Sequence, residues 1–310
     1  MGHDERVLAR AAWRAQRIAF ERDLGRRIRH GVGGPARISW REPLLIGLDR
    51  MASRLGMRRL GVRLASGFVI SRHDIAVPGL PAPFDGYRIL HLSDLHADIV
   101  PGAVEAVARR LAGEAFDLVA LTGDYQTDHG PPLPEVYAGI GHALAMLAPV
   151  DGAFAVLGNH DHHDTPEALE AQGVTLLLNE RSVIGRGGAS LSLVGTDDVH
   201  AFCSAAALAL LGAPAPGPSV ALVHSPEAAD IAAAAGHALY LCGHTHGGQI
   251  CLPGGRPLVT VLERHRDLAS GRWRLGGMQG FTNRGLGASV PPIRLNCPAE
   301  AAVLTLIRQS

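Results

Sequence analysis

Short apolar runs alternate with longer Ala- and Leu-rich segments in the part of the chain that follows residue 83. A short apolar run between turn residues predicts a buried strand, whereas apolar positions three or four residues apart predict a helix. We expect strands at 87–92, 116–121, 153–157, 174–178, 181–184, 191–194, 220–223, 239–242 and 301–307, and helices at 104–112, 133–147, 165–172, 204–211 and 226–235. This alternation predicts an α/β layered domain.

The first 75 residues differ from the rest, because arginines are interleaved with apolar residues there. Residues 1–30 and 42–64 predict two basic amphipathic helices, with a glycine-rich break at 30–35. Residues 1–75 contain 16 Arg against 7 Asp and Glu, a balance of +9, so the remainder of this neutral chain carries −9. We therefore expect a basic N-terminal extension (1–77) followed by a main domain (78–310).

The basic extension has three interpretations. Its arginines and apolar faces suit a surface that lies on an anionic membrane through residues 1–75. Acidic residues such as Glu21 and Asp23 weaken this interpretation. A helix packed on the main domain and a loosely ordered tail are the alternatives.

The chain carries few signs of export or membrane insertion. No uninterrupted apolar run approaches the roughly 18–20 residues of a membrane span, and no signal-peptide core follows the N-terminal arginines. The cysteines form no C-x-x-C pair and suggest free thiols in a reducing compartment: they are Cys203, Cys242, Cys251 and Cys297. We expect a cytoplasmic protein, peripheral to the inner face of the cytoplasmic membrane.

Five of the predicted strands end in polar residues that can bind a metal. His244 and His246 are two residues apart, so an extended backbone points both imidazoles to one side. Asp94 and His96 have the same spacing. Because ligands bind at the carboxyl ends of strands in α/β sheets, we expect these loops to share one site. The metal-competent side chains are those of Asp94, His96, Asp124, Asn159, His224, His244 and His246.

This set consists of carboxylates, imidazoles and an amide oxygen, and it contains no sulfur. It suits Mn, Fe or Zn in a catalytic site better than a structural zinc site. One ion takes roughly four to six ligands, so seven ligands with one shared carboxylate suit two ions about 3.5–4 Å apart. The expected cofactor is a pair of divalent metal ions, with manganese favoured.

The order of these blocks resembles a known family pattern. D-x-H, G-D, G-N-H-D, a lone His and G-H-T-H occur in the order found in the calcineurin-like metallophosphoesterases, over residues 87–250. The runs at 247–253 and 283–294 look like those of a bacterial, often membrane-associated subgroup, which includes phosphodiesterases and enzymes that cleave the diphosphate of UDP-diacylglucosamine. The resemblance implies a four-layer α/β/β/α sandwich of two mixed β-sheets, here with a basic helical N-terminal extension.

The resemblance also implies roles for the motif residues. His160 would protonate the leaving group as general acid, oriented by Asp161. A metal-bridging hydroxide would attack phosphorus in line, without a covalent intermediate. One ion would be held by Asp94, His96 and His246, the other by Asn159, His224 and His244, and Asp124 would bridge the two.

The substrate is less well determined. The basic N-terminus and the subgroup resemblance favour a lipid-linked substrate, such as UDP-2,3-diacylglucosamine or a phospholipid. A nuclease or a cyclic-nucleotide phosphodiesterase is the main alternative, although the balance of −9 after residue 75 disfavours a broad nucleic-acid surface. A non-catalytic metal-binding scaffold is the alternative of another class.

Four further residues are candidates for contact with substrate. Arg284 and Arg294 would bind phosphate, or would form structural ion pairs. His162 and His163 would touch substrate, or would be exposed loop histidines. Asp197, Asp198 and His200 would line the cleft or satisfy a turn, and we favour the turn. We expect the histidines outside the motifs to have no role in the site.

Overall fold

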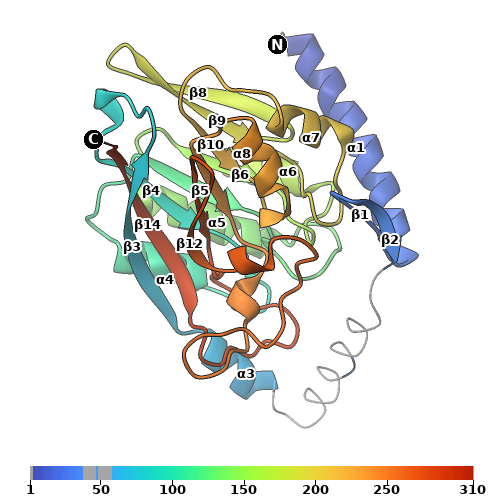
Figure 1. The fold of residues 1–310 in the computed structure, drawn as a ribbon. Helices are drawn as coiled ribbons and strands as arrows, with labels where there is room; N and C mark the ends of the chain where they lie inside the picture. Colours follow the sequence, from blue (N-terminus) through green and yellow to red (C-terminus); the bar gives the residue numbers. More distant parts are fainter. Residues whose placement is uncertain (1–2, 38–46, 48–57, 310) are drawn as a thin grey trace.

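The computed structural model describes residues 3–37, Gly47 and residues 58–309 (Figure 1). Sheet I has the strand order β3-β14-β4-β5-β6-β7, and sheet II has the order β12-β13-β11-β10-β9-β8. The strands of sheet I are β3 (Phe68–Val77), β4 (Tyr87–Leu92), β5 (Leu118–Thr122), β6 (Ala153–Val156), β7 (Val174–Leu176) and β14 (Ala299–Arg308). Those of sheet II are β8 (Glu180–Arg186), β9 (Ala189–Gly195), β10 (Ser219–Leu222), β11 (Leu239–Cys242), β12 (Gly271–Leu275) and β13 (Met278–Thr282).

Both sheets are mixed. In sheet I, β4, β5, β6 and β7 are parallel, and β14 is antiparallel to β4. In sheet II, β9, β10, β11 and β13 are parallel, with antiparallel β8 and β12 at the two edges. The carboxyl ends of the parallel strands therefore collect at one edge of each sheet.

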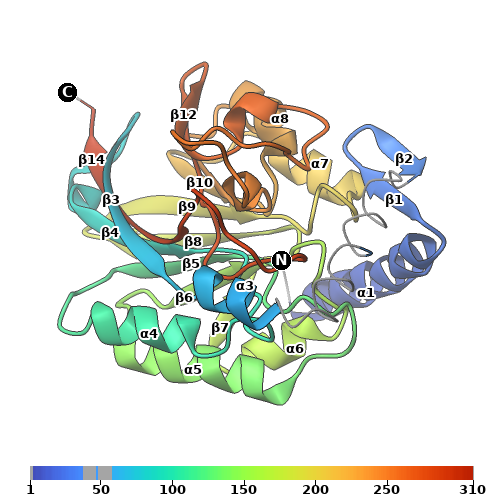
Figure 2. The same cartoon turned by 90° about the horizontal axis from the view of Figure 1, so that it is seen from below.

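Helices cover the outer face of each sheet, as Figure 2 shows. Helices α4, α5 and α6 lie on sheet I, and α7 and α8 lie on sheet II. One apolar core fills the space between the sheets and two others lie beneath the helices. The predicted four-layer sandwich is confirmed. The helices are α1 (His3–Gly25), α3 (Arg58–Ala65), α4 (Ala103–Arg110), α5 (Pro134–Leu147), α6 (Thr165–Glu170), α7 (Ala205–Leu211) and α8 (Ala229–Ala234).

Local sequence accounts for where several of these elements begin. The side chain of Ser204 accepts a hydrogen bond from the backbone N–H of Ala207 (3.1 Å) and so caps α7. Pro134 and Pro166 lie in the first turns of α5 and α6, where a missing N–H costs nothing. Strand β4 is buried on both faces, as its nearly continuous apolar sequence predicts.

Strand β14 lies between β3 and β4, although it comes last in the described chain. It pairs in parallel with β3 over its whole length, from Ala299 with Phe68 to Arg308 with Val77. Sheet I thus includes the segment Phe68–Val77, which sequence analysis assigns to the N-terminal extension.

Each of the predicted strands of the main domain is present, with small shifts at its ends. The sequence did not predict β3, β12, β13 or the hairpin of β1 (Ile28–Gly31) and β2 (Gly34–Arg37). The helix expected over residues 1–30 ends at Gly25, because the chain turns there into β1. Most of the amphipathic segment expected at 42–64 lies outside the described residues, and α3 falls at its end.

Helix α1 runs along α6 at one side of the molecule (Figure 1). Its arginines bind acidic residues of the domain: Arg10 contacts Glu170 (2.9 Å) and Arg14 contacts Glu167 (2.7 Å). Among the described residues, no helix combines the length and the apolar character that crossing a membrane requires.

Candidate metal centre

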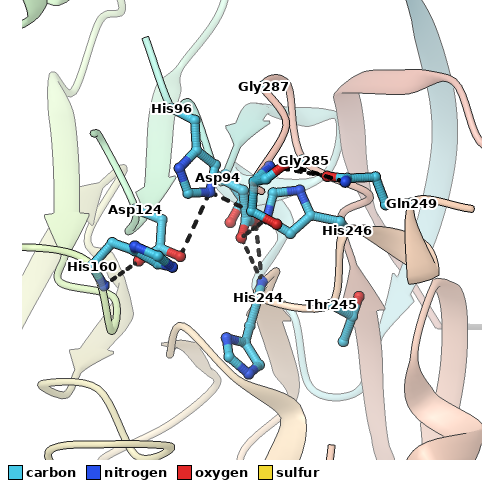
Figure 3. Close-up of polar contacts among 12 residues, drawn as sticks. Asp94, His96, Asp124, His160, His244, Thr245, His246, Gln249, Gly285 and Gly287 are labelled. Carbon is cyan, nitrogen blue, oxygen red and sulfur yellow. Dashed lines mark hydrogen bonds and ion pairs between the residues drawn. The ribbon is translucent and has the colours of Figure 1, made fainter. Parts of the chain in front are cut away.

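Loops from both sheets meet at the edge where the parallel strands end (Figure 3). The loops after β4, β5 and β6 come from sheet I, and those after β10 and β11 come from sheet II. They bring together all seven predicted ligands in two groups, which are Asp94, His96 and His246 in the first and Asp124, His224 and His244, with Asn159, in the second.

In the first group, ring nitrogens and a carboxylate face one another at short range. Nε2 of His96 lies 3.2 Å from Nε2 of His246, and that nitrogen lies 3.4 Å from Oδ1 of Asp94. All three side chains are buried.

In the second group, Nε2 of His224 lies 3.2 Å from both Nδ1 of His244 and Oδ1 of Asn159. Oδ2 of Asp124 lies 3.3 Å from the same His224 nitrogen and 3.8 Å from Nε2 of His96. One carboxylate oxygen therefore faces both groups.

The backbone of this centre is strained. Non-glycine residues rarely adopt the left-handed region, where each costs roughly 1–3 kcal/mol. The backbone after β11 also approaches the loop after β4 so closely that position 243 must be glycine, because a Cβ there would collide with the side chains of Ser93 and Asp94. Five of the seven ligand residues have positive φ: Asp94 (48°), His96 (38°), Asp124 (57°), His244 (70°) and His246 (51°).

Two of the imidazoles are oriented by hydrogen bonds to the ring nitrogen that faces away from the site. Nδ1 of His224 donates to the carbonyl oxygen of Thr122 (2.6 Å), so Nε2 is the ring nitrogen that faces the site. Nδ1 of His96 lies 2.9 Å from Oγ1 of Thr127. Partners of this kind fix the ring orientation of metal-binding histidines.

Burial controls the charge of these rings. It lowers the pKa of His96 to about 3 and holds the pKa values of His244 and His246 well below the usual range. These rings are neutral, as metal ligands must be. His224 differs: burial opposes its charge, but the Asp124 carboxylate raises its pKa well above the ordinary value.

The donor set fits divalent cations. Ligand atoms about 2.1 Å from one ion in octahedral geometry lie about 3 Å apart, close to the 3.2 Å between the facing nitrogens of His96 and His246. The carboxylate of Asp124 draws a proton onto His224, so the second group already attracts positive charge. Neutral imidazoles, carboxylates and an amide oxygen are also the donor types that such ions accept.

His160 lies at the edge of the two groups. Its backbone N–H donates to Oδ1 of Asp124 (2.9 Å), and its ring Nδ1 lies 2.8 Å from the carbonyl oxygen of Thr127. Because a carbonyl can only accept, Nδ1 carries the proton in this contact and Nε2 remains for other partners.

The prediction that Asp161 orients the ring of His160 is wrong. The Thr127 carbonyl does so. The Asp161 carboxylate is buried and instead joins its own loop, after β6, to the loop after β5 through backbone N–H groups. Its partners are the N–H groups of Gly158 (2.7 Å), Asp124 (2.8 Å) and Tyr125 (2.9 Å).

The predicted phosphate contacts of Arg284 and Arg294 are also wrong, because both guanidinium groups bind within the protein. Arg284 forms a two-point ion pair with Glu300 (3.0 and 3.1 Å), which was the alternative interpretation. Arg294 is buried and donates to the carbonyl oxygens of Gly287, Arg284 and Gly285 (2.6, 2.7 and 3.0 Å). Its Nη2 lies 3.3 Å from Nδ1 of His246, so Arg294 supports the ring of a predicted ligand.

His162 and His163 lie against α1. Glu21 of this helix accepts from the backbone N–H (2.9 Å) and contacts ring Nδ1 (2.6 Å) of His163. The predicted substrate contact of His163 is therefore replaced by a contact with the helix. The contact predicted for His162, whose Nδ1 accepts from the N–H of Asp164 (3.3 Å), stays a prediction.

Three residues beside the centre were missed by sequence reasoning. Thr127 orients His96 and His160, and the ring of His129 stacks on that of His160, with centroids 4.5 Å apart. The ring of His200 lies 4.2 Å from that of His244. A signal existed only for His200, since it follows a strand of sheet II as the ligands do.

A family model of calcineurin-like phosphoesterases matches residues 87–248. The chain belongs to this family and is a metal-dependent phosphoester hydrolase. The predicted family and class of enzyme are thereby confirmed.

Individual relatives are similar over most of the chain. Phosphodiesterase YaeI of Escherichia coli (strain K12) is 33% identical, over 77% of this chain and 88% of its own length. The uncharacterized metallophosphoesterases YkuE and YkoQ of Bacillus subtilis (strain 168) are 28% and 32% identical, over 76% and 72% of this chain and 84% of their own lengths.

Proposed function

We propose that the chain hydrolyses a phosphodiester or diphosphate bond with two divalent ions. The observation that carries the proposal is the Asp124 carboxylate, which faces both ligand groups. Manganese is favoured, and iron and zinc suit the same donors. One ion would be held by Asp94, His96 and His246, the other by Asn159, His224 and His244, and Asp124 would be shared.

When bound, two such ions neutralise phosphate oxygens and make a water acidic enough to attack phosphorus in line. The leaving oxygen then needs a proton. The contact of Nδ1 with the Thr127 carbonyl leaves Nε2 of His160 facing other partners, and the ring protonated on both nitrogens would give its Nε2 proton to the leaving oxygen as a general acid.

We infer a lipid-linked substrate, such as UDP-2,3-diacylglucosamine or a phospholipid, from the loop that follows His246. This apolar loop (residues 250–261) packs beside the segment that carries His246, since the carbonyl oxygen of Val259 lies 3.1 Å from where a Cβ on Gly248 would be. Contiguous exposed apolar side chains mark interaction surfaces. Five large ones are 47–58% exposed here: Leu252, Leu258, Val259, Val261 and Leu295, which neighbours the loop.

The same loop supports a peripheral position on the inner face of the cytoplasmic membrane. Its Arg256 is exposed and suits anionic lipid. Several arginines of α1 instead face acidic residues of the domain, including Arg10 with Glu170. We therefore place the main membrane contact on the apolar loop, with residues 1–75 as an additional basic surface.

Two other functions are disfavoured. A nuclease or cyclic-nucleotide phosphodiesterase fits poorly with the balance of −9 after residue 75 and with an apolar loop beside the site. A non-catalytic metal-binding scaffold would not need a histidine held as His160 is, with one ring nitrogen left over.

Side-by-side assays test the proposal. The full chain would be stripped with a chelator, reloaded with Mn, Fe or Zn, and given UDP-2,3-diacylglucosamine, phospholipid vesicles, bis(p-nitrophenyl) phosphate, a cyclic nucleotide and DNA. We expect metal-dependent hydrolysis of the aryl diester and of a lipid-linked substrate. Cleavage of DNA or the cyclic nucleotide alone would overturn the lipid assignment. Metal binding without any hydrolysis would favour the scaffold.

A further inference from the structure

Arg17 lies on α1, more than 140 residues before the loop of residues 158–161. Arg17 is nevertheless buried against this loop and only 1% exposed. Nη1 donates to Oδ1 of Asp197 (2.5 Å), and Nη2 donates to the carbonyl oxygens of Gly158 (2.8 Å) and Asp161 (2.5 Å). The group also stacks 3.5 Å over the ring of Phe202.

These two carbonyl groups flank Asn159 and His160. A guanidinium is planar and rigid, so its donors hold their acceptors in a fixed relation to one another. The carboxylate of Asp161 holds the opposite side of the same turn through the N–H of Gly158 (2.7 Å). The turn is thus fixed from two sides, and one side is supplied by the N-terminal helix.

A second residue of α1, Trp13, binds the same carboxylate as Arg17 and fixes the helix beside the loop. Trp13, one turn earlier on the same face of α1, donates from Nε1 to Oδ2 of Asp197 (2.7 Å). Both oxygens of Asp197 are therefore used by α1. A buried guanidinium is costly unless it is paired, and Asp197 supplies the opposite charge.

We propose that Arg17 is a positioning residue of the active site, through which α1 sets the geometry of the turn that carries Asn159 and His160. The inference rests on the proposed function, in which Asn159 binds one metal and His160 protonates the leaving group. A displaced His160 would slow substrates with poor leaving groups most, because these depend on proton donation.

Arg17→Lys tests this role without removing the charge. The ammonium of lysine can still pair with Asp197, but it cannot hold both carbonyl oxygens in the rigid geometry of a guanidinium. We expect kcat on a diester with a poor leaving group to fall roughly 10- to 100-fold, the general-acid range, with KM little changed. Amide hydrogen exchange in residues 159–161 should rise about tenfold, with β6 unaffected.

Arg10→Lys is the matched control, because Arg10 lies on the same helix and binds Glu170, Glu180 and the carbonyl oxygen of Leu176, all outside the loop of residues 158–161. It should leave kcat and loop exchange within about twofold of wild type. A second variant, Arg17→Ala, opens a space for free guanidinium. Millimolar guanidinium should restore part of the lost kcat and of the loop protection, and equal urea should restore neither.

Wild-type kcat and wild-type loop exchange in a folded Arg17→Lys protein would overturn the proposal. Equal losses across all amides, without a selective change at 159–161, would also overturn it, since that is the signature of simple destabilisation. If neither Arg17 variant folds, Asp197→Asn probes the same contact from the domain side and should give the same selective changes. A wild type that is inactive on every phosphoester contradicts only the proposed function. Amide exchange at residues 159–161 would still report whether Arg17 holds the loop.

Discussion

The residues of the metal centre hold their backbone in a conformation that non-glycine residues avoid. Asp94 and His244 illustrate how this is stabilised: both have positive φ, and the backbone N–H of His244 donates to both oxygens of the Asp94 carboxylate (3.0 and 3.1 Å). Such strain persists only where the surroundings over-determine it, and it clusters at functional sites. Conservative substitutions here should therefore change the chemistry while the loops keep their shape.

His160→Ala tests the general acid. The variant should keep both metal ions, because its ring is not among the ligand atoms that face each other. We expect kcat to fall about 10²- to 10⁴-fold for a substrate with a poor leaving group. The loss should be much smaller for a p-nitrophenyl leaving group, which needs no proton. Steady-state kinetics and metal analysis of the same preparation measure both effects.

His142→Ala is the control, since His142 is exposed on α5. It should match wild type on both substrates. Equal loss on good and poor leaving groups in His160→Ala would argue against proton donation and for a role in holding the loop.

For single residues, the sequence predicts the candidate metal ligands better than the residues that hold the surrounding loops in place. The seven ligands follow apolar strands at the spacing expected of a site at strand ends. By contrast, Arg294 and Asp161 bind backbone groups of loops distant in sequence. Nothing in a side-chain pattern reveals which carbonyl or N–H will lie beside a given residue, so the sequence predicts a phosphate contact for Arg294 and an orienting contact with His160 for Asp161.

At the scale of elements, the apolar loop stands apart because it exposes large side chains beside the metal centre. Replacing Leu258 and Val259 together with serine should weaken binding to anionic vesicles about tenfold or more, since burying each such side chain contributes roughly 1.5–3 kcal/mol. Hydrolysis of a soluble aryl diester should stay within about twofold of wild type. Vesicle flotation and a soluble assay measure the two properties.

Val150→Ser is the matched control, because Val150 is 72% exposed in the loop between α5 and β6. It should leave vesicle binding unchanged. Equal vesicle binding by the double variant and wild type would show that the apolar loop does not contact lipid.

Strands differ in how well sequence predicts them, and burial of both faces accounts for part of the difference. Strands β4 and β5 are buried on both faces and have nearly continuous apolar sequences. Strand β12 lies at the edge of sheet II and alternates partly buried with exposed positions, and its two exposed residues are Arg272 and Arg274. A strand that fully buries neither face needs little apolar sequence. Its existence depends on the strand beside it.

At the scale of the whole molecule, the two ligand groups join the two sheets. Each group combines side chains from loops of sheet I with side chains from loops of sheet II. Metal at 100 times its Kd should stabilise the folded state by about 2.7 kcal/mol. For a chain of this size that is a rise in Tm of about 4 °C. Thermal unfolding with manganese and with excess chelator measures it.

Asp124→Asn should remove most of this metal-dependent rise, because the shared carboxylate faces both groups. The Tm of the variant in chelator should stay close to that of the wild type in chelator. A variant that loses only one of two binding events would contradict the sharing of Asp124.

The position of β14 has a consequence for the order of events during synthesis. β3 and β4 are separated by only a short connection, yet they cannot pair with each other, because the place between them belongs to residues 299–308. A chain emerging from the ribosome presents both strands, each with an open edge, some 200 residues before their partner is made. Open edges invite pairing with other chains. Sheet I can close only once those late residues have left the ribosome.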